Sequence, residues 1–369
     1  MAQNAERISD KVYWVGARDY SCRSFHGYYT ARGVTYNSYL ILGDEPIVID
    51  GVKAEFAGEQ LARIASVLPP EQIRHIVCNH SEFDHSGSIR TLAARSGAKV
   101  HALPAGVKQL TAMYGAMEYV PLTPSKPYTL GSETLTTYAT PMVHWPDNAV
   151  TLYGDILFTN DAFGQHFASA NLLDTENDMA GVLAEAKKYY ANIVMPYAAQ
   201  AAKAVAAVKA LSPAVIAPSH GVVLTEHIAD MYALYERLTS GQKEDKAVVV
   251  FDTMWGHTET LARTVGENLK TRFAEVRYFD LRVDPLSEAV TETADCALLA
   301  IGSPTHYLTV LPMIAAFMNE LKSLKPSVPE YIAFGSYGWG GGAVKEINET
   351  MAALGYRHSE TFTDVTKVF

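Results

Sequence analysis

The chain has 369 residues, of which 48% are apolar and 19% are charged, and its formal net charge is −10. This composition excludes a disordered chain and a membrane protein, and the length allows two or three domains that each bury a core. The negative charge works against binding to phosphate backbones, so nucleic acid is not an expected partner.

Neither the start of the chain nor its cysteines indicate export. Residues 1–10 lack the basic and then apolar pattern of a signal peptide, and no apolar run approaches the length of a membrane span, so we expect a cytoplasmic protein. The cysteines, Cys22, Cys78 and Cys296, are widely spaced and form no C-x-x-C pair. They encode neither a disulfide framework nor a rubredoxin-type iron centre.

The first predicted elements are short β-rich runs at residues 12–15, 38–42 and 46–51. They form a meander that predicts one sheet of a layered α/β domain. Between the first two runs lies His26, and a lone histidine in such a place is more often structural than catalytic. A helix is predicted over residues 54–68.

The next strand, residues 75–78, opens into the polar segment N-H-S-E-F-D-H-S-G at residues 79–87. His80, Glu82 and Asp84 recur at every second position, so an extended backbone would turn all three to one side, with His85 directly after them. These imidazoles and carboxylates suit iron or zinc, and the absence of a thiolate argues against an iron–sulfur cluster or a structural zinc. The alternative is a polar surface loop that caps a helix. The metal hypothesis is favoured because burying so many ionisable groups without a counter-ion is costly.

Further candidate ligands follow later predicted strands. Helices are predicted at residues 86–95, 181–190 and 198–211, and strands at residues 99–102, 128–130, 135–139, 149–153, 156–159 and 215–218. His144, Asp161 and His220 each lie just past a strand end, and the two carboxylate oxygens of Asp161 could join two metals. Taken alone, each of these is most simply an ordinary polar loop residue.

A polar stretch with turn residues at 239–246 separates the two organised regions. The all-apolar strand that follows, residues 247–251, is typical of a parallel sheet and leads through residues 253–258 into a helix at 261–269. Hydroxyls and backbone amides at a helix start make a seat for a single phosphate. There is no P-loop lysine and no G-x-G-x-x-G pattern, and one such turn by itself would be read as an ordinary capped helix.

Strands predicted at residues 275–281, 296–301 and 331–334 alternate with helices, which predicts a doubly wound sheet with a ligand crevice at its carboxyl strand ends. Two of those ends carry the segments 302–307 and 335–341. Their small residues allow close backbone approach, and Tyr307, Tyr337 and Trp339 can contact a flat ring system.

The H-x-E-x-D-H segment resembles the diiron variant of the H-x-H-x-D-H signature of metallo-β-lactamase-fold proteins, a variant typical of flavodiiron proteins. Glu82 stands where the zinc hydrolases of that fold usually carry a second histidine, and a carboxylate there favours iron over zinc. The resemblance implies that His80, Glu82 and His144 bind one iron, that Asp84, His85 and His220 bind the other, and that Asp161 bridges them. It also makes His26 and Tyr197 candidate pocket residues, although a packed core tyrosine is the alternative for Tyr197.

The three later loops resemble a flavodoxin-like FMN site. The resemblance places the phosphate on residues 253–258 and the isoalloxazine ring between the other two loops. The implied FMN residues are Thr253, Met254, Trp255, Gly256, His257, Thr258, Ser303, Pro304, Thr305, His306, Tyr307, Ser336, Tyr337, Gly338, Trp339 and Gly340.

The resemblance covers nearly the whole chain and implies its fold. Residues 1–245 would form a metallo-β-lactamase-like αββα sandwich, and residues 246–369 a flavodoxin-like doubly wound parallel sheet without its last helix. Residues 359–363 are the expected last strand. The missing helix would leave one apolar face of the sheet partly uncovered.

The resemblance further implies reduction of dioxygen to water, of nitric oxide to nitrous oxide, or of both, with electrons entering through FMN from an external rubredoxin or similar small carrier. It implies a head-to-tail homodimer in which the FMN of one subunit faces the irons of the other, with Trp145 and Glu82 near the interface. The sequence leaves open the preferred gas and the physiological donor.

Two other functions use the same residues. A dizinc hydrolase of the metallo-β-lactamase class would attack an ester with a metal-bound hydroxide, and Glu82 and the flavin-type loops weigh against it. A non-catalytic electron carrier or gas sensor would use the same cofactors without turnover.

Overall fold

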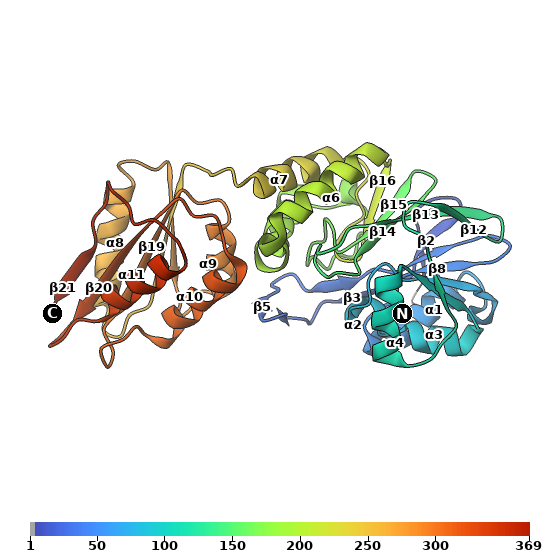
Figure 1. Ribbon diagram of the computed structural model, residues 1–369, viewed down its shortest axis with the longest axis horizontal. Helices are drawn as coiled ribbons and strands as arrows, with labels where there is room; N and C mark the ends of the chain where they lie inside the picture. The colour runs from blue at the N-terminus through green and yellow to red at the C-terminus, as the bar shows by residue number, and fades with distance from the viewer. Residues whose placement is uncertain (1–3) are drawn as a thin grey trace. The chain divides into compact units, whose positions relative to one another are not determined.

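The computed structural model in Figure 1 describes residues 4–369. Contacts divide the chain into two compact units. The first unit holds the residues up to Phe25, Thr30–Tyr189 and Ala199–Glu236, and the second holds His26–Tyr29, Tyr190–Ala198 and Arg237–Phe369. Within residues 4–369, none of the helices combines the length and apolar character that crossing a bilayer requires.

The first unit contains two large sheets. The strands of the larger, mixed sheet are, in spatial order, β1 (Glu6–Arg7), β2 (Val12–Trp14), β7 (Tyr39–Ile41), β8 (Ile47–Ile49), β9 (His75–Val77), β10 (Lys99–Ala102) and β11 (Tyr119–Pro121). Those of the smaller sheet are β12 (Pro127–Leu130), β13 (Glu133–Ala139), β14 (Ala149–Tyr153), β15 (Ile156–Asn160) and β16 (Val215–Pro218). The short strands β3 (Ala17–Asp19) and β6 (Val34–Tyr36) form a separate two-stranded sheet. The short strands β4 (Ser24–Phe25) and β5 (Tyr28–Tyr29) also lie outside both large sheets, and β5 belongs to the second unit.

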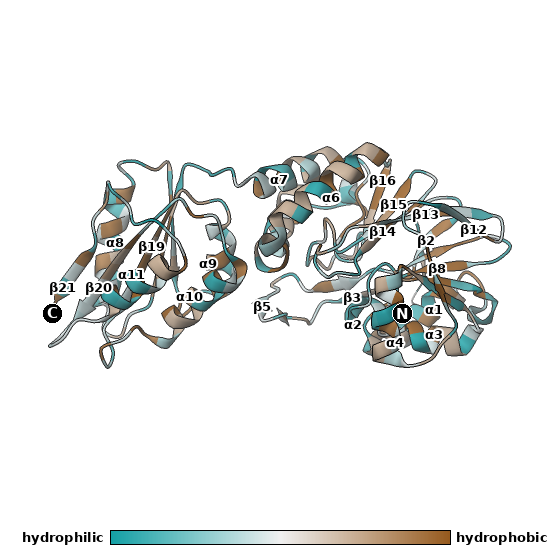
Figure 2. Cartoon of the chain, in the orientation of Figure 1, coloured by the Kyte–Doolittle hydropathy of each residue, from teal (hydrophilic) through white to brown (hydrophobic). Residues whose placement is uncertain are grey.

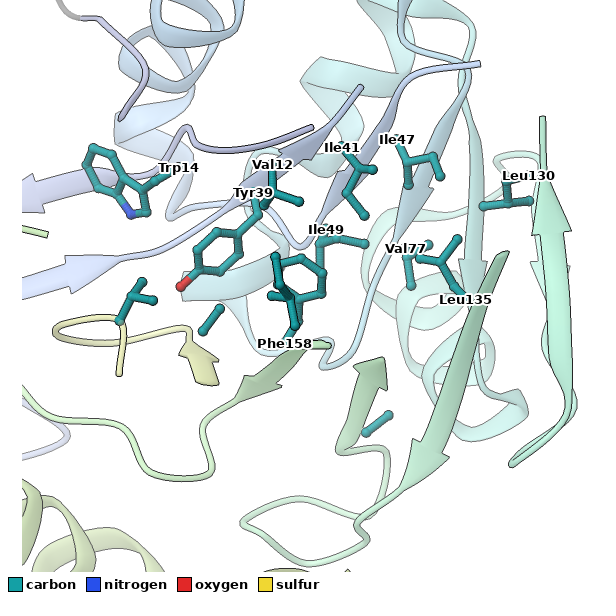
Figure 3. Close-up of a cluster of buried hydrophobic side chains, with 14 of the residues drawn as sticks. Val12, Trp14, Tyr39, Ile41, Ile47, Ile49, Val77, Leu130, Leu135 and Phe158 are labelled. Atoms are coloured by element: carbon teal, nitrogen blue, oxygen red, sulfur yellow. The ribbon is translucent and has the colours of Figure 1, made fainter. Parts of the chain in front are cut away.

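The main core of the first unit lies between its sheets. Tyr39 and Ile49 of the larger sheet meet Leu135 and Phe158 of the smaller one in a fully buried cluster (Figure 3). Because side chains alternate along a strand, the neighbouring residues of the larger sheet, such as Leu40, face the opposite way and pack against helices.

Helices cover the outer faces of the sandwich. On the larger sheet these are α1 (Ala57–Ala65), α3 (Ile89–Ser96) and α4 (Pro104–Tyr114). Beside the smaller sheet lie α5 (Met179–Tyr189), α6 (Ala198–Leu211) and α7 (Ile228–Ser240) (Figure 1). This is the αββα sandwich that the sequence predicted, and Figure 2 shows apolar residues along its strands and on parts of its helices. Helices α4 and α7 were not anticipated.

The second unit is a sheet of parallel strands with helices on both faces. Its strands, in spatial order, are β18 (Glu275–Asp280), β17 (Lys246–Phe251), β19 (Leu298–Pro304), β20 (Glu330–Tyr337) and β21 (Val365–Val368). Its helices are α8 (His257–Leu269), α9 (Leu286–Thr293), α10 (Pro312–Leu324) and α11 (Ala343–Ala353). Val249, Ile332 and Phe334 pack against Leu261 and Val265 of α8 in its core. The predicted doubly wound sheet is confirmed.

The last strand of this sheet differs from the prediction. Residues 359–363 form a turn, and the strand is β21, which pairs with β20 from Phe334 to Tyr337. Asp364 accepts a hydrogen bond from the backbone of Ala333 at 2.8 Å and thereby holds the chain next to β20 before β21 begins. Phe362 in the turn packs on the α8 side of the core, so the turn itself covers part of the face that the sequence left open.

Phe158 tests the inter-sheet core, because its ring is 1% exposed and lies 5.1 Å from that of Tyr39. Phe158→Ala removes most of the ring and leaves a cavity, so we expect the free energy of unfolding of the first unit to fall by about 3–5 kcal/mol. Urea unfolding measures the loss, with Tyr20→Ala at a 52% exposed site as the control. A loss no larger than that of the control would contradict the described core.

Candidate metal centre and cofactor pocket

All the predicted metal ligands lie in the first unit, at the loops that follow β9, β13, β15 and β16. They form two groups, and within each group one ligand atom from every side chain lies within 4.8 Å of the others. The first group is His80, Glu82, His144 and Asp161, and the second is Asp84, His85 and His220.

Asp161 lies between the two groups. Its Oδ1 is 2.9 Å from Nε2 of His85 and 3.7 Å from Nε2 of His220. Its Oδ2 is 3.6 Å from Nε2 of His80 and 3.4 Å from Nε2 of His144. Each oxygen therefore faces a different group, which is the arrangement a bridging carboxylate needs.

Glu82 and Asp84 complete the two groups. Oε2 of Glu82 lies 3.2 Å from Nε2 of both His80 and His144. Oδ2 of Asp84 lies 3.2 Å from Nε2 of both His85 and His220. Each group thus brings imidazole nitrogens and carboxylate oxygens to one point, without a thiolate, which is a donor set suited to iron.

The burial of these atoms supports the presence of cations. His85 and Asp161 are fully buried, and Asp84 is nearly so. Oδ1 of Asp84, both oxygens of Asp161 and both ring nitrogens of His85 make no hydrogen bond within the described residues. Buried polar atoms without partners are costly, and ions at the two groups would give the carboxylate oxygens and Nε2 of His85 a partner.

The carboxylates also raise the pKa values of three of the imidazoles. Burial opposes protonation of His80, but its hydrogen bonds with Asp147 and Glu82 outweigh burial and raise its pKa to about 10. Burial is likewise outweighed at His144, where Asp161 and Glu82 raise the pKa to about 10, and at His85, where the charges of Asp84 and Asp161 raise it to about 9. The pocket therefore attracts positive charge, and bound metal ions would replace these protons.

The sequence predicted an extended backbone through the ligand segment, but the backbone is helical at Asp84 and His85. Asp84 and His85 lie in the short helix α2 (Phe83–Ser86), directly after Glu82. The carbonyl of Glu82 accepts hydrogen bonds from the backbone N–H groups of His85 and Ser86 at 3.0 and 2.8 Å. Because of this turn, Glu82 points to the group of His80 and His144, whereas Asp84 points to the group of His85 and His220.

Sequence reasoning missed the residues that orient the histidines. Oδ1 of the buried Asp147 lies 3.1 Å from Nδ1 of His80, and its Oδ2 accepts the backbone N–H of Ser81 at 2.8 Å. The carbonyl of Thr35 lies 2.5 Å from Nδ1 of His220. In both cases Nδ1 is engaged and Nε2 faces the ligand group. The acidic residue soon after His144 was the only sequence signal for either partner.

Hydrogen bonds to the buried carboxylate of Asp50 connect the loops that carry the ligands. Asp50 accepts hydrogen bonds from the backbone and the side chain of Asn79 at 2.6 and 3.0 Å, and from the side chain of Asn160 at 3.2 Å. Asn160 in turn accepts the backbone N–H of Asp161 at 2.8 Å. The network fixes the ends of β8, β9 and β15 relative to one another.

His26 and Tyr197 belong to the second unit, apart from the unit that holds the metal groups. His26 is exposed and has φ +50°, and Tyr197 is half-buried at the end of a 3-10 turn. Their segments pack within the second unit: the backbone N–H of Tyr29 donates to Ser287 at 3.0 Å. Their predicted roles in the metal pocket stay predictions.

The three predicted cofactor loops meet at a pocket of about 320 Å³ in the second unit. It is lined by Met254, Trp255, His257, Pro304, Thr305, Ser336, Tyr337, Gly338, Trp339 and Phe369. Phe369 was not predicted, and its ring stacks on His257 with centroids 4.1 Å apart. Trp255 and Trp339 are more than 80% exposed, so a flat ring system could cover them.

The other predicted loop residues support this pocket or lie beside it. Thr253 accepts the backbone N–H of Gly256, the residue before α8, at 3.1 Å. The hydroxyls of Thr258 and Ser336 lie 2.8 Å apart. Strands β19 and β20 extend further at their carboxyl ends than predicted, because they include Ser303, Pro304, Ser336 and Tyr337. The pocket lining does not include the predicted residues Thr253, Gly256, Thr258, Ser303, His306, Tyr307 and Gly340.

Comparisons with known proteins cover both units. Residues 34–221 match the ODP family beta lactamase, and residues 249–366 match Flavodoxin. The chain is 35% identical to the nitric oxide reductase of Moorella thermoacetica, over 94% of this chain and 89% of that one. The structure of rubredoxin oxygen:oxidoreductase from Desulfovibrio gigas superposes with a TM-score of 0.95 and 32% identity, over 99% and 94% of the two chains. The flavodiiron protein of Giardia intestinalis gives 0.94 and 30%, over 99% and 92%.

Asp161 is the sharpest test of the metal centre, because its oxygens face both groups. We expect Asp161→Ala to bind fewer metal ions per chain than the unchanged protein, and to hold the remaining ion at least about tenfold more weakly. Metal analysis after dialysis measures this, with Asp155→Ala at the exposed turn between β14 and β15 as the control. Equal metal content in both variants would contradict a shared carboxylate.

Trp339 tests the cofactor pocket. Trp339→Ala removes an exposed indole from its lining, so we expect FMN to bind about 2- to 10-fold more weakly, in line with the loss of one aromatic stacking contact. Fluorescence titration with FMN measures the affinity. Val283→Ala, which alters a 78% exposed residue outside the pocket lining, should bind FMN normally. An unchanged affinity in Trp339→Ala would place the ring elsewhere.

Proposed function

The chain belongs to the flavodiiron protein family, and on that basis we propose which residues carry its chemistry. It is an oxidoreductase that reduces dioxygen to water, nitric oxide to nitrous oxide, or both, at a non-haem diiron centre. Electrons pass through FMN from an external rubredoxin-type donor.

We assign His80, Glu82 and His144 to one iron and Asp84, His85 and His220 to the other, with Asp161 bridging. The observation that carries this assignment is the position of Asp161, whose two oxygens lie near histidines of different groups. Glu82 adds a carboxylate where a zinc hydrolase of this fold would have an imidazole, and so favours iron.

When bound, the irons supply the electrons and the open coordination positions for a diatomic gas. The protein's part is to hold the ligand atoms in place. Asp147 and the carbonyl of Thr35 fix the rings of His80 and His220 so that each Nε2 faces its group. The burial of the ligands keeps bulk water from competing for the metals.

FMN would bind in the pocket of the second unit. We place its phosphate at residues 253–258, where the start of α8 offers backbone N–H groups, and its ring near Tyr337 and Trp339. The flavin connects a one-electron donor to the multi-electron reaction, while the protein positions it.

We further propose a domain boundary at residues 245 and 246, a cytoplasmic location and a head-to-tail homodimer with Trp145 and Glu82 near its interface. The exposure of Trp255, Tyr307 and Trp339, each above 80%, supports an additional covering surface in the second unit. An active species with the mass of a single chain in light scattering would rule out the dimer.

Turnover tests the proposed function directly. Protein reconstituted with ferrous iron and FMN should consume dioxygen, nitric oxide or both when reduced rubredoxin is supplied, and Asp161→Ala should fall to near the background rate. Parallel assays with each gas under anaerobic control measure the preference. Zinc without flavin in the purified protein would favour a hydrolase, and bound iron and FMN without gas consumption would favour an electron carrier or sensor.

A further inference from the structure

The loop that carries His220 is held by the segment between β6 and β7. The backbone N–H of Asn37 donates to the carbonyl of Ser219 at 2.7 Å. The side-chain nitrogen of Asn37 donates to the carbonyls of Pro218 and Gly221 at 2.8 and 2.9 Å. One buried residue thus holds the backbone on both sides of His220.

Trp14 fixes the orientation of the Asn37 amide. Nε1 of Trp14 donates to Oδ1 of Asn37 at 2.9 Å, and an indole N–H can only donate. The amide oxygen must therefore face Trp14, which leaves the amide nitrogen for the two carbonyls. Trp14 is itself fully buried at one end of the inter-sheet cluster (Figure 3), with the guanidinium groups of Arg18 and Arg63 at 4.2 and 4.6 Å from its ring.

Thr35, two residues before Asn37, also holds the loop that carries His220. Its carbonyl accepts a hydrogen bond from Nδ1–H of His220, and its hydroxyl accepts one from the backbone N–H of Gly221 at 2.7 Å. Gly221 has φ +87°, and a Cβ there would lie 1.9 Å from the side-chain oxygen of Gln165, so the loop has no space to relax on that side. His220 consequently presents Nε2 in one direction, toward Asp84.

The other ligand group does not share this support. His80 is oriented by Asp147, which lies in the loop between β13 and β14 and also holds the backbone of Ser81. His80 and His220 are therefore oriented by different parts of the first unit, although both groups use Asp161 and the backbone of Ser219 is hydrogen-bonded to Asn160 of the Asp50 network.

We propose that Asn37 is a positioning residue for the metal site formed by Asp84, His85 and His220, and that this site is loaded with metal separately from the site of His80, Glu82 and His144. The proposal rests on the ligand assignment given under the proposed function. Loss of the Asn37 amide donors removes two of the hydrogen bonds that hold the loop at residues 218–221 and weakens one site, while the other keeps its supports.

The test uses the metal-free full chain and Co²⁺ as the probe, followed by calorimetry and by visible absorption of the bound ion. Asn37→Asp keeps the shape of the side chain but turns two donated hydrogen bonds into repulsion with carbonyl oxygens. We expect one of the two Co²⁺ ions to bind about 10- to 100-fold more weakly, with the other unchanged.

Asp147→Asn is the matched control, because it should weaken the other ion by a similar factor and give a different absorption change. Trp14→Phe is a milder variant that keeps an aromatic ring in the core but removes the donor to Asn37 and part of the buried ring, so it should weaken the same ion as Asn37→Asp, by a smaller factor. It also serves if Asn37→Asp does not fold.

The outcomes separate the two proposals. If the unchanged protein binds two ions and the Asn37 or Trp14 variants bind both with unchanged affinity, or lose both equally, then Asn37 does not position a single site. If the unchanged protein binds fewer than two ions, the assigned binuclear centre itself is wrong.

Discussion

The structure depends on the burial of seven ionisable side chains at one end of the αββα sandwich. Four of them are imidazoles and three are carboxylates. They can be buried together only if their charges balance. Nearby carboxylates outweigh burial and raise the pKa values of His80, His85 and His144, so the pocket favours positive charge. Iron ions would supply that positive charge and direct contacts to the ligand atoms. The need to hold these groups at fixed positions explains why the ligands lie in the segments that follow β9, β13, β15 and β16, on a rigid scaffold.

Most of this arrangement was predictable from the sequence, because strands and their exits have local signatures. The apolar runs before His80, Asp161 and His220 are strands, and the polar residue after each of them is brought into the site. The turn at Asp84 and His85 was not predictable, because it forms through bonds to the carbonyl of Glu82 in a segment too short to show a helical period. Asp147 and Asn37 were missed because their partners are distant in sequence.

The second unit shows the same division between local and distant signals. Its parallel strands and its cofactor loops followed from apolar runs and small residues. The last strand was misplaced because residues 359–363 have a strand-like composition, whereas the pairing of β21 depends on contacts of Asp364 and Phe362 with β20 and the α8 side of the core. Tertiary contacts thus overrode local propensity. The roles of His26 and Tyr197 came from the family resemblance, and no local pattern in the sequence separates a pocket residue from a packed one.

A centre that changes oxidation state works best when its ligands move little between states. Two of the four ligand histidines are held at Nδ1 in the structure. His80 is held by the carboxylate of Asp147, and His220 is held by the backbone carbonyl of Thr35. A carboxylate partner makes an imidazole a stronger electron donor than a neutral carbonyl does. The irons assigned to these histidines would therefore differ in electron density even with similar ligand sets. Asp161 contacts both groups and would therefore connect two metal sites with unequal surroundings.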